Sequence, residues 1–325
     1  MTRPYLTIFS LLIFFALLST ACDPLGSEAV AAVPTPIASA TNTASPAPPT
    51  ATDAPLLPTG TPFPSSTPGE CSDPHGQIVS DAFSSKVTHA SVAYRIYLPP
   101  CYWQSNRRYP YAMLFHGSDS DQTQWTDALK VDKVLDQGIA AGTLPPMIVV
   151  MPTGGDLANT NIFRDGMSFE WLVINELMPL VEKTFCTWNT REGRAIGGIS
   201  RGGFWAYEIA LRHPELFGAV GGHSAFFDKD AMPPLYNPLN LATTIKFAPG
   251  LQPRFWLDAG QDDYARPALE AFAKELSDRG INPGYTLYPI GQHESAYWAQ
   301  HVTEYMAFYG QTWPRSSSEL PSCLQ

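Results

Sequence analysis

The chain has 325 residues and a formal net charge of -10, and 44% of its residues are hydrophobic. The negative charge and the lack of any basic cluster argue against nucleic-acid binding. The residues after about position 71 suffice for one domain with a full hydrophobic core.

The first 22 residues have the pattern of an export signal. One positive charge, Arg3, precedes an apolar stretch over 5–18 that is too short for a comfortable membrane span. The Ser-Thr-Ala-Cys sequence at 19–22 resembles a bacterial lipobox, although it lacks the usual leucine three residues before the cysteine. We expect a signal peptide over 1–22, lipid on Cys22 and an extracytoplasmic protein anchored to the cell membrane. Plain secretion and a retained N-terminal anchor are the alternatives.

Residues 23–70 are rich in Pro, Thr, Ala and Ser, with almost no aromatic residues and no regular apolar period. Such a composition cannot bury enough surface to offset its ordering entropy, so we expect a disordered linker. Its prolines favour the extended polyproline II conformation, which fits a spacer between a membrane and the domain expected over 71–325.

Four cysteines fall within that domain: Cys71, Cys101, Cys186 and Cys323. An even number in an exported domain allows two disulfides, in three connectivities. Since Cys71 and Cys323 lie at its two ends, we expect a bond between them that closes the domain. The cysteine and histidine spacing does not suggest zinc, and none of these cysteines lies in a setting typical of a nucleophile.

Strand-like apolar runs and helical periods alternate along the domain. We expect strands at about 92–98, 111–115, 147–151, 194–197, 217–221, 255–259 and 285–288, and helices at about 125–138, 169–185, 205–213, 265–280 and 295–308. This alternation predicts an α/β protein with a mostly parallel central sheet and helices on both faces. The segment 226–250, rich in Pro and Asn, has no strong period and is interpreted as a small lid or substrate-side insertion.

The pentapeptide Gly198-Ile199-Ser200-Arg201-Gly202 lies between a predicted strand and a predicted helix. This is the pattern of a nucleophile elbow, in which a sharp turn exposes a serine hydroxyl and glycines two residues away avoid collisions with neighbouring backbone. In a chain with 24 glycines the pattern alone is weak evidence. Its interpretation therefore depends on partners for Ser200 elsewhere in the chain.

An acid and a base follow in the chain order that α/β-hydrolases use. Asp262 and Asp263 come after one predicted strand and His293 after the next. Reactive groups of such sheets lie past the carboxyl ends of the strands, so these side chains are expected to meet Ser200 at one edge. We assign His293 as the base and Asp263 as the acid, with Asp262 and Asp258 as alternative acids. The backbone N–H groups of Ser118 and Arg201 are expected to form the oxyanion hole.

The remaining histidines are assigned structural positions. We expect His116 beside the oxyanion hole, His223 packed behind the elbow, and surface or capping positions for His75, His89, His213 and His301. Asp119 and Asp121 are interpreted as solvated loop carboxylates rather than metal ligands, and we expect no metal and no cofactor.

Taken together, these motifs resemble the Putative esterase family of the α/β-hydrolase superfamily. That family includes esterase D (S-formylglutathione hydrolase), feruloyl esterases, enterochelin esterases and the antigen 85 mycolyltransferases. The resemblance covers about 84–310 and rests on the motifs at 94–102, 109–110, 116–117, 176–179, 197–203, 213–217 and 291–294, followed by Trp298.

The resemblance implies Ser200 as nucleophile, Asp263 as acid, His293 as base and the Ser118 and Arg201 amides as oxyanion donors. It implies no cofactor. Many members have methionine in place of Arg201. We interpret this guanidinium as paired with a nearby carboxylate, with recognition of an acidic or polar acyl group as the alternative.

The sequence thus predicts a surface-tethered serine esterase that hydrolyses carboxylic esters, with acylated or feruloylated polysaccharide as the candidate substrate. The expected partners are this ester substrate and the membrane. One alternative is an acyltransferase of the antigen 85 type, which passes the acyl group to an alcohol instead of water. Another is a non-catalytic binding lipoprotein on a hydrolase scaffold.

Overall fold

A computed structural model of the protein describes residues 71–230 and 232–324. The signal peptide expected over 1–22, the lipidation site Cys22 and the linker expected over 23–70 lie outside the described residues, so these assignments stay predictions. Among the residues described, no helix has both the length and the apolar character needed to cross a bilayer.

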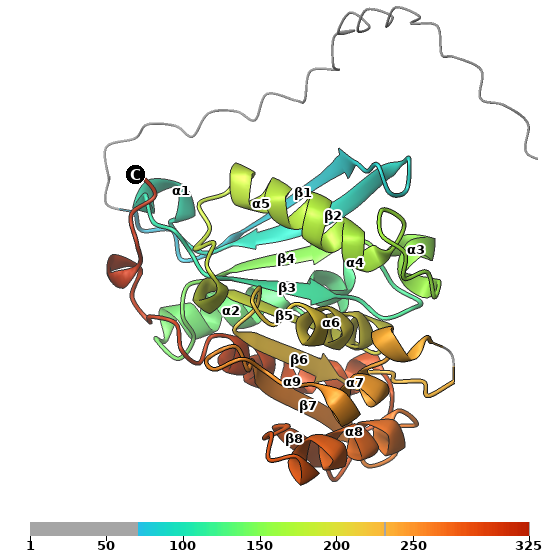
Figure 1. Cartoon of the computed structure of the whole chain (residues 1–325). Coiled ribbons are helices and arrows are strands. Elements are labelled where there is room, and N and C mark those ends of the chain that lie inside the picture. Colours follow the sequence, from blue (N-terminus) through green and yellow to red (C-terminus); the bar gives the residue numbers. More distant parts are fainter. Residues whose placement is uncertain (1–70, 231, 325) are drawn as a thin grey trace, which may run out of the picture. The chain divides into compact units, whose positions relative to one another are not determined.

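An eight-stranded sheet in the order β1-β2-β4-β3-β5-β6-β7-β8 runs through the described part of the chain (Figure 1). β2 is antiparallel to both of its neighbours, and the strands from β4 to β8 are parallel to one another. The strands are β1 Gln77–Ser84, β2 Ser91–Leu98, β3 Tyr111–Phe115, β4 Ile148–Pro152, β5 Arg194–Ile199, β6 Ala219–His223, β7 Arg254–Gly260 and β8 Tyr285–Tyr288. The predicted α/β class with a mostly parallel sheet is confirmed.

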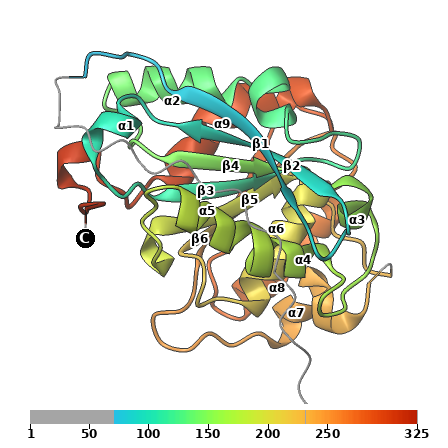
Figure 2. The ribbon, with the colours of Figure 1, turned by 90° about the horizontal axis from the view of Figure 1, so that it is seen from above.

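Helices cover both faces of this sheet. In Figure 2, α2 and α9 lie on one face, and α4, α5, α6 and α8 lie on the other. The helices are α1 Tyr102–Ser105, α2 Val131–Ala140, α3 Gly155–Asn159, α4 Phe169–Leu172, α5 Met178–Thr184, α6 Arg201–Arg212, α7 Pro238–Thr244, α8 Arg266–Asp278 and α9 Ser295–Tyr309. Two π-helical segments, Gln124–Ala128 and Val173–Leu177, and short 3-10 segments at Arg191–Gly193, Pro234–Tyr236 and Ser317–Glu319 complete the described elements.

The central strand β3 shows how one apolar run serves two cores. All five of its residues are buried. Met113 packs into the core under α4 to α6, whereas Ala112 and Leu114 pack into the core under α2 and α9. Successive side chains of a strand point to opposite faces, so a strand between two helical layers must be apolar throughout.

Several elements differ from the sequence prediction. The edge strand β1 was not expected, because most of its residues are exposed and it lacks an apolar alternation. The helix expected over 125–138 is divided into a π-helical turn and α2, with Lys130 at a φ of 57° between them. The insertion over 226–250 contains a 3-10 turn and α7. The helix expected over 169–185 is continuous, with a π-helical segment before Pro179, whose ring and missing N–H disfavour regular α-helix there.

The disulfides pair differently from our expectation. Cys71 bonds to Cys101 and Cys186 bonds to Cys323, with Cα atoms 5.6 and 5.8 Å apart respectively. The expected bond between Cys71 and Cys323 is therefore wrong. The antiparallel pairing of β1 with β2 brings the segment before β1 to the end of β2, where Cys101 lies. The C-terminal segment runs beside the chain after α1, since the Cys323 N–H donates to the Asn106 carbonyl oxygen.

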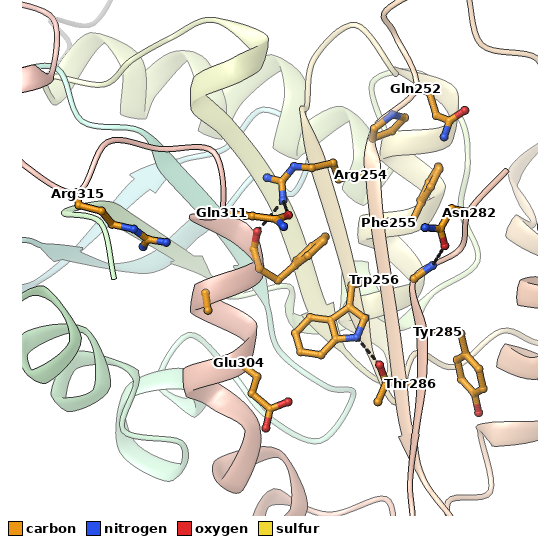
Figure 3. A pocket seen from close by; sticks show the side chains of 14 residues that line it. Gln252, Arg254, Phe255, Trp256, Asn282, Tyr285, Thr286, Glu304, Gln311 and Arg315 are labelled. Atoms are coloured by element: carbon orange, nitrogen blue, oxygen red, sulfur yellow. Dashed lines mark hydrogen bonds between the residues drawn. The ribbon is translucent and has the colours of Figure 1, made fainter. Parts of the chain in front are cut away.

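A cavity of about 900 Å³ opens at the amino ends of β7 and β8 (Figure 3). Arg254 crosses it to donate to the carbonyl oxygens of Phe308 and Tyr309, which closes the C-terminus of α9. Trp256 donates its indole N–H to the Thr286 hydroxyl. This cavity lies at the end of the strands opposite to the carboxyl ends, where the sequence places the reactive groups.

Candidate active site

Ser200 occupies a strained turn between β5 and α6. Its φ and ψ are 54° and -117°, a conformation that L-residues rarely adopt and that is typical of functional turns. A Cβ atom on Gly198 would lie 2.4 Å from the carbonyl carbon of Gly202, and one on Gly202 would lie 2.5 Å from the carbonyl oxygens of Phe115 and His116. Both flanking glycines are thus required by backbone packing, as the elbow pattern predicted.

The structure brings Ser200, His293 and Asp263 together at the carboxyl ends of the strands. The Nε2 atom of His293 lies 2.8 Å from the Ser200 hydroxyl oxygen, and its Nδ1 atom lies 2.9 Å from Oδ1 of Asp263. A carboxylate only accepts hydrogen bonds, so the ring proton is on Nδ1 and Nε2 is free to accept the serine proton. The three side chains are thus hydrogen-bonded in the order acid, base and alcohol, as in a catalytic triad.

Among the described residues, His293 forms its ion pair with Asp263 and with neither of the alternative acids. Asp262 donates its backbone N–H to the Gly291 carbonyl oxygen, which joins the acid loop to the histidine loop. Asp258 is fully buried and binds His223 instead. A Cβ atom on Gly260 would lie 2.3 Å from the Gly291 carbonyl oxygen, so the two loops touch backbone to backbone.

Asp263 is held as a charged carboxylate. Burial raises its pKa, but the hydrogen bond from His293, the nearby Ser224 hydroxyl and the hydrogen bond from the backbone N–H of Ala265 outweigh burial and leave the pKa below its ordinary value. The Ala265 N–H donates to Oδ1 at 2.8 Å. A carboxylate that stays ionised at neutral pH can stabilise positive charge on His293.

Ser224 and Trp298 lie beside these three side chains, and the sequence predicts no role in the site for them. The indole N–H of Trp298 donates to the Ser224 hydroxyl oxygen at 2.9 Å, and its ring meets the His293 ring edge-on with centroids 5.2 Å apart. An indole nitrogen only donates, so the Ser224 hydroxyl keeps its own proton, and this hydroxyl helps to lower the pKa of Asp263. The one feature of the sequence that could have indicated Ser224 is its position directly after β6, at the carboxyl ends of the strands.

The two expected oxyanion donors belong to the two segments that meet Ser200. Arg201 is the first residue of α6, where backbone N–H groups point out of the helix. Ser118 follows Gly117, whose Cβ position would lie 3.6 Å from the Cβ atom of Ser200. The Gly117 N–H is fixed by the Gln124 side-chain oxygen at 2.9 Å. The loop after β3 and the start of α6 therefore converge on the nucleophile.

The Arg201 side chain binds carbonyl oxygens rather than a carboxylate. It donates to the backbone oxygens of Ala158 and Thr160 and to the side-chain oxygen of Asn161 at 2.7 to 2.9 Å. Burial lowers its pKa to about 10, and the charge of Glu208 acts on it without an ion pair. Our expectation of a direct carboxylate partner is wrong. The guanidinium instead ties the segment after α3 to the start of α6.

Three other histidines, His116, His213 and His75, bind partners outside the triad. His116 donates from Nδ1 to the Gly117 carbonyl oxygen and accepts the Gly154 N–H at Nε2, and burial lowers its pKa. His213 pairs with Glu170, and His75 pairs with Asp136. Within residues 71–230 and 232–324, no three His, Cys, Asp or Glu side chains are grouped so that they could hold a metal ion.

This sheet, with a serine elbow, an acid and a histidine at its carboxyl edge, defines an α/β-hydrolase. The model of the family described as "Putative esterase" matches residues 85–309, and the chain belongs to that family. Among solved structures, a ferulic acid esterase superposes with a TM-score of 0.65 at 23% identity, over 73% of this chain and 99% of that one. An S-formylglutathione hydrolase from Staphylococcus aureus superposes with a TM-score of 0.62 at 19% identity, over 72% and 99%.

Two curated relatives match parts of the chain. An endo-1,4-beta-xylanase/feruloyl esterase of Xylanibacter ruminicola is 35% identical over 158 residues, which are 45% of this chain and 21% of that protein. An esterase of Mycobacterium tuberculosis is 34% identical over 133 residues, which are 40% of this chain and 28% of that protein. The chain thus spans about a fifth to somewhat over a quarter of the length of these relatives.

Proposed function

We propose that the protein is a serine esterase that hydrolyses carboxylic esters through an acyl-enzyme. The observation that carries this proposal is the placement of His293 between Ser200 and Asp263, at 2.8 and 2.9 Å. A serine hydroxyl becomes a useful nucleophile when an adjacent base can take its proton. Membership of the esterase family supports the same chemistry.

In the first half of the reaction, the Ser200 oxygen attacks the ester carbonyl carbon while its proton passes to Nε2 of His293. The carbonyl oxygen becomes an oxyanion that the Ser118 and Arg201 amides stabilise. The bond to the alcohol oxygen then breaks, and His293 gives that oxygen the proton. In the second half, water gives a proton to His293 and attacks the acyl carbon. The bond from the acyl carbon to the Ser200 oxygen then breaks, His293 returns the proton to that oxygen, and the acid leaves.

The proposed substrates are acyl or feruloyl esters of polysaccharide. One curated relative, described as an endo-1,4-beta-xylanase/feruloyl esterase, supports this choice, as do structural neighbours described as ferulic acid esterases. A large external substrate also suits the proposed export and lipid anchoring at Cys22. The two disulfides are compatible with an oxidising compartment outside the cytoplasm.

Hydrolysis of an ester panel tests the activity. Acetyl, long-acyl and feruloyl esters and a thioester are offered to the wild type and to Ser200→Ala, and free acid is measured with and without an added alcohol. We expect acid release from at least one ester and a fall of about 10⁶-fold in kcat for Ser200→Ala. Transfer to the alcohol in place of acid release would indicate an acyltransferase. An inactive wild type would favour a binding protein.

Fractionation of cells that express the full chain tests the anchor. We expect the wild type in the membrane fraction and Cys22→Ala in the soluble extracytoplasmic fraction, because one cysteine carries the whole lipid attachment. Equal membrane association of both proteins would contradict lipidation at Cys22.

A further inference from the structure

Tyr264, the residue after the acid Asp263, has no role in the mechanism above. Its side chain is 65% exposed, which is unusual for a large aromatic residue. Its ring lies against the His293 ring, with centroids 4.2 Å apart and planes 34° apart. The Phe226 ring lies at a steep angle to it, with centroids 6.0 Å apart and planes 67° apart. One side of the tyrosine ring is thus covered by the catalytic base, and much of the rest is open.

The groups that act on the Tyr264 phenol belong to the catalytic site. Partial burial raises its pKa, an interaction with the Ser200 side chain lowers it, and the charges of Asp263 and Asp119 raise it, so that it ends above its ordinary value. Asp119 belongs to the loop after β3, and Asp263 belongs to the loop after β7. Tyr264 is exposed and packs on the His293 ring, so it lies beside the catalytic groups, and its protonated phenol can donate a hydrogen bond at neutral pH.

The position of His293 identifies the half of the ester that meets this tyrosine. His293 gives its proton to the alcohol oxygen, so the alcohol must leave beside the imidazole. The carbonyl oxygen points the other way, toward the amides of Ser118 and Arg201. A ring that lies on the imidazole is therefore on the alcohol side.

We propose that Tyr264, with Phe226 at its edge, is the surface that binds the alcohol half of the ester and favours alcohols with an apolar ring face, such as sugars. This inference rests on the proposed esterase function. An exposed aromatic face packs well against flat apolar surfaces, and a protonated phenol can also donate to a sugar hydroxyl. Phe226 is held in place from below, because its backbone N–H donates to the Ser200 carbonyl oxygen at 3.0 Å.

The test separates the alcohol half from the acyl half. One series keeps the feruloyl group and compares its methyl ester with its ester of a pentose sugar. A second series keeps methanol and varies the acyl group between acetyl and feruloyl. For Tyr264→Ala, we expect kcat/KM to fall about tenfold further for the sugar ester than for the methyl ester, a size typical of an aromatic contact. Within the methyl series the acyl preference stays that of the wild type.

Two further variants sharpen the test. Tyr264→Phe keeps the ring and is expected to retain most of the preference for the sugar ester. Tyr285→Phe is the matched control at the opposite end of the strands, because it removes a phenol hydroxyl that makes no hydrogen bond in the described part of the chain (Figure 3). We expect it to match the wild type on every ester. Thermal unfolding checks that each variant is folded.

Equal losses on the methyl and sugar esters would overturn the inference, as would a loss that follows the acyl group. These results leave the esterase proposal standing, because the wild type is active in both. A wild type that hydrolyses no ester in either series, and so matches Ser200→Ala, would overturn both proposals.

Discussion

Two histidine–aspartate pairs lie close together in this protein, and only one of them faces a nucleophile. His293 and Asp263 are 2.9 Å apart, and the histidine side chain is 10% exposed. His223 and Asp258 are 2.6 Å apart, and both side chains are fully buried. The second ring nitrogen of His293 meets the Ser200 hydroxyl. The comparison indicates that access and the third partner, rather than the pair itself, decide which histidine can act as a base.

Both members of the buried pair, His223 and Asp258, are hydrogen-bonded to tyrosine hydroxyls. Nε2 of His223 lies 2.8 Å from the Tyr309 hydroxyl, and Oδ2 of Asp258 accepts from Tyr297 and Tyr305 at 2.8 and 3.1 Å. These tyrosines come from α9 and leave no path for a substrate. Every member of the group has a hydrogen-bond partner, which is the condition under which a buried polar network is stable.

The buried pair also supports the catalytic pair through its backbone. The His223 carbonyl oxygen accepts the Ser200 N–H at 3.0 Å, and the Asp258 carbonyl oxygen accepts the Ser224 N–H at 2.8 Å. Ser224 in turn interacts with Asp263. The structural pair therefore holds the strand ends on which the catalytic groups are placed.

Breaking the catalytic pair is expected to have the largest effect. His293→Gln should lower kcat/KM by about 10⁵-fold or more, because the serine loses its base. Its thermal unfolding midpoint should stay close to that of the wild type, since the residue lies at the surface end of the network. Ester hydrolysis and calorimetry measure the two effects, and substantial remaining activity would contradict the assignment.

Breaking the buried pair should affect stability instead. Asp258→Asn leaves His223 and two tyrosine hydroxyls with an altered partner, and we expect a loss of about 3–5 kcal/mol in the free energy of unfolding. Denaturant titration measures this loss. The folded fraction should keep activity within about tenfold of the wild type, as expected for a group that does not touch the substrate. A stable but inactive variant would mean that Asp258 acts in the chemistry.

Removing the link between the two pairs should have a smaller effect. Ser224→Ala removes the hydroxyl that helps to lower the pKa of Asp263, and we expect kcat/KM to fall about tenfold. The pKa of Asp263, measured from the NMR shift of its carboxyl carbon, should rise toward its ordinary value. Ser168→Ala is the matched control, because Ser168 is a buried serine that caps α4 away from the site. An Asp263 pKa that changes equally in both variants would contradict the role of Ser224.

The pH dependence of stability gives the smallest expected difference. The pKa of Asp263 is lowered in the folded protein, so the unfolded chain binds its proton first as the pH falls. The carboxylate therefore stabilises the fold above the ordinary aspartate pKa of about 3.9, and this contribution is lost as the pH falls through the folded value. Asp263→Asn should lose stability relative to the wild type near pH 7 and approach it in acid. A constant difference across this range would contradict the lowered pKa.

The sequence predicts the parts of this fold that burial specifies. Fully apolar runs such as β3 and β4 were recognised because both faces of those strands are covered. The exposed edge strand β1 carries no such signal. The disulfide pairing followed from the antiparallel contact of β1 with β2, so missing the strand also removed the basis for pairing Cys71 with Cys101.

The site was predictable where residue order and strand ends determine it. Ser200, Asp263 and His293 each follow a parallel strand, and the structure places them within hydrogen-bond distance. The positions of Ser224 and Tyr264 depend on how the loops after β6, β7 and β8 pack together. The spacing of residues along the sequence does not determine that packing. The partners of Arg201 were misjudged for the same reason, because they are backbone carbonyl oxygens of a distant loop.

Covalent labelling with a fluorophosphonate tests the central claim most directly, because this reagent reacts with a serine that has an adjacent base. We predict one phosphonyl group per chain, located on Ser200 by peptide mass spectrometry, with no labelling of Ser200→Ala and much slower labelling of His293→Gln. A label on another residue of the wild type, or equal labelling of all three proteins, would contradict the account.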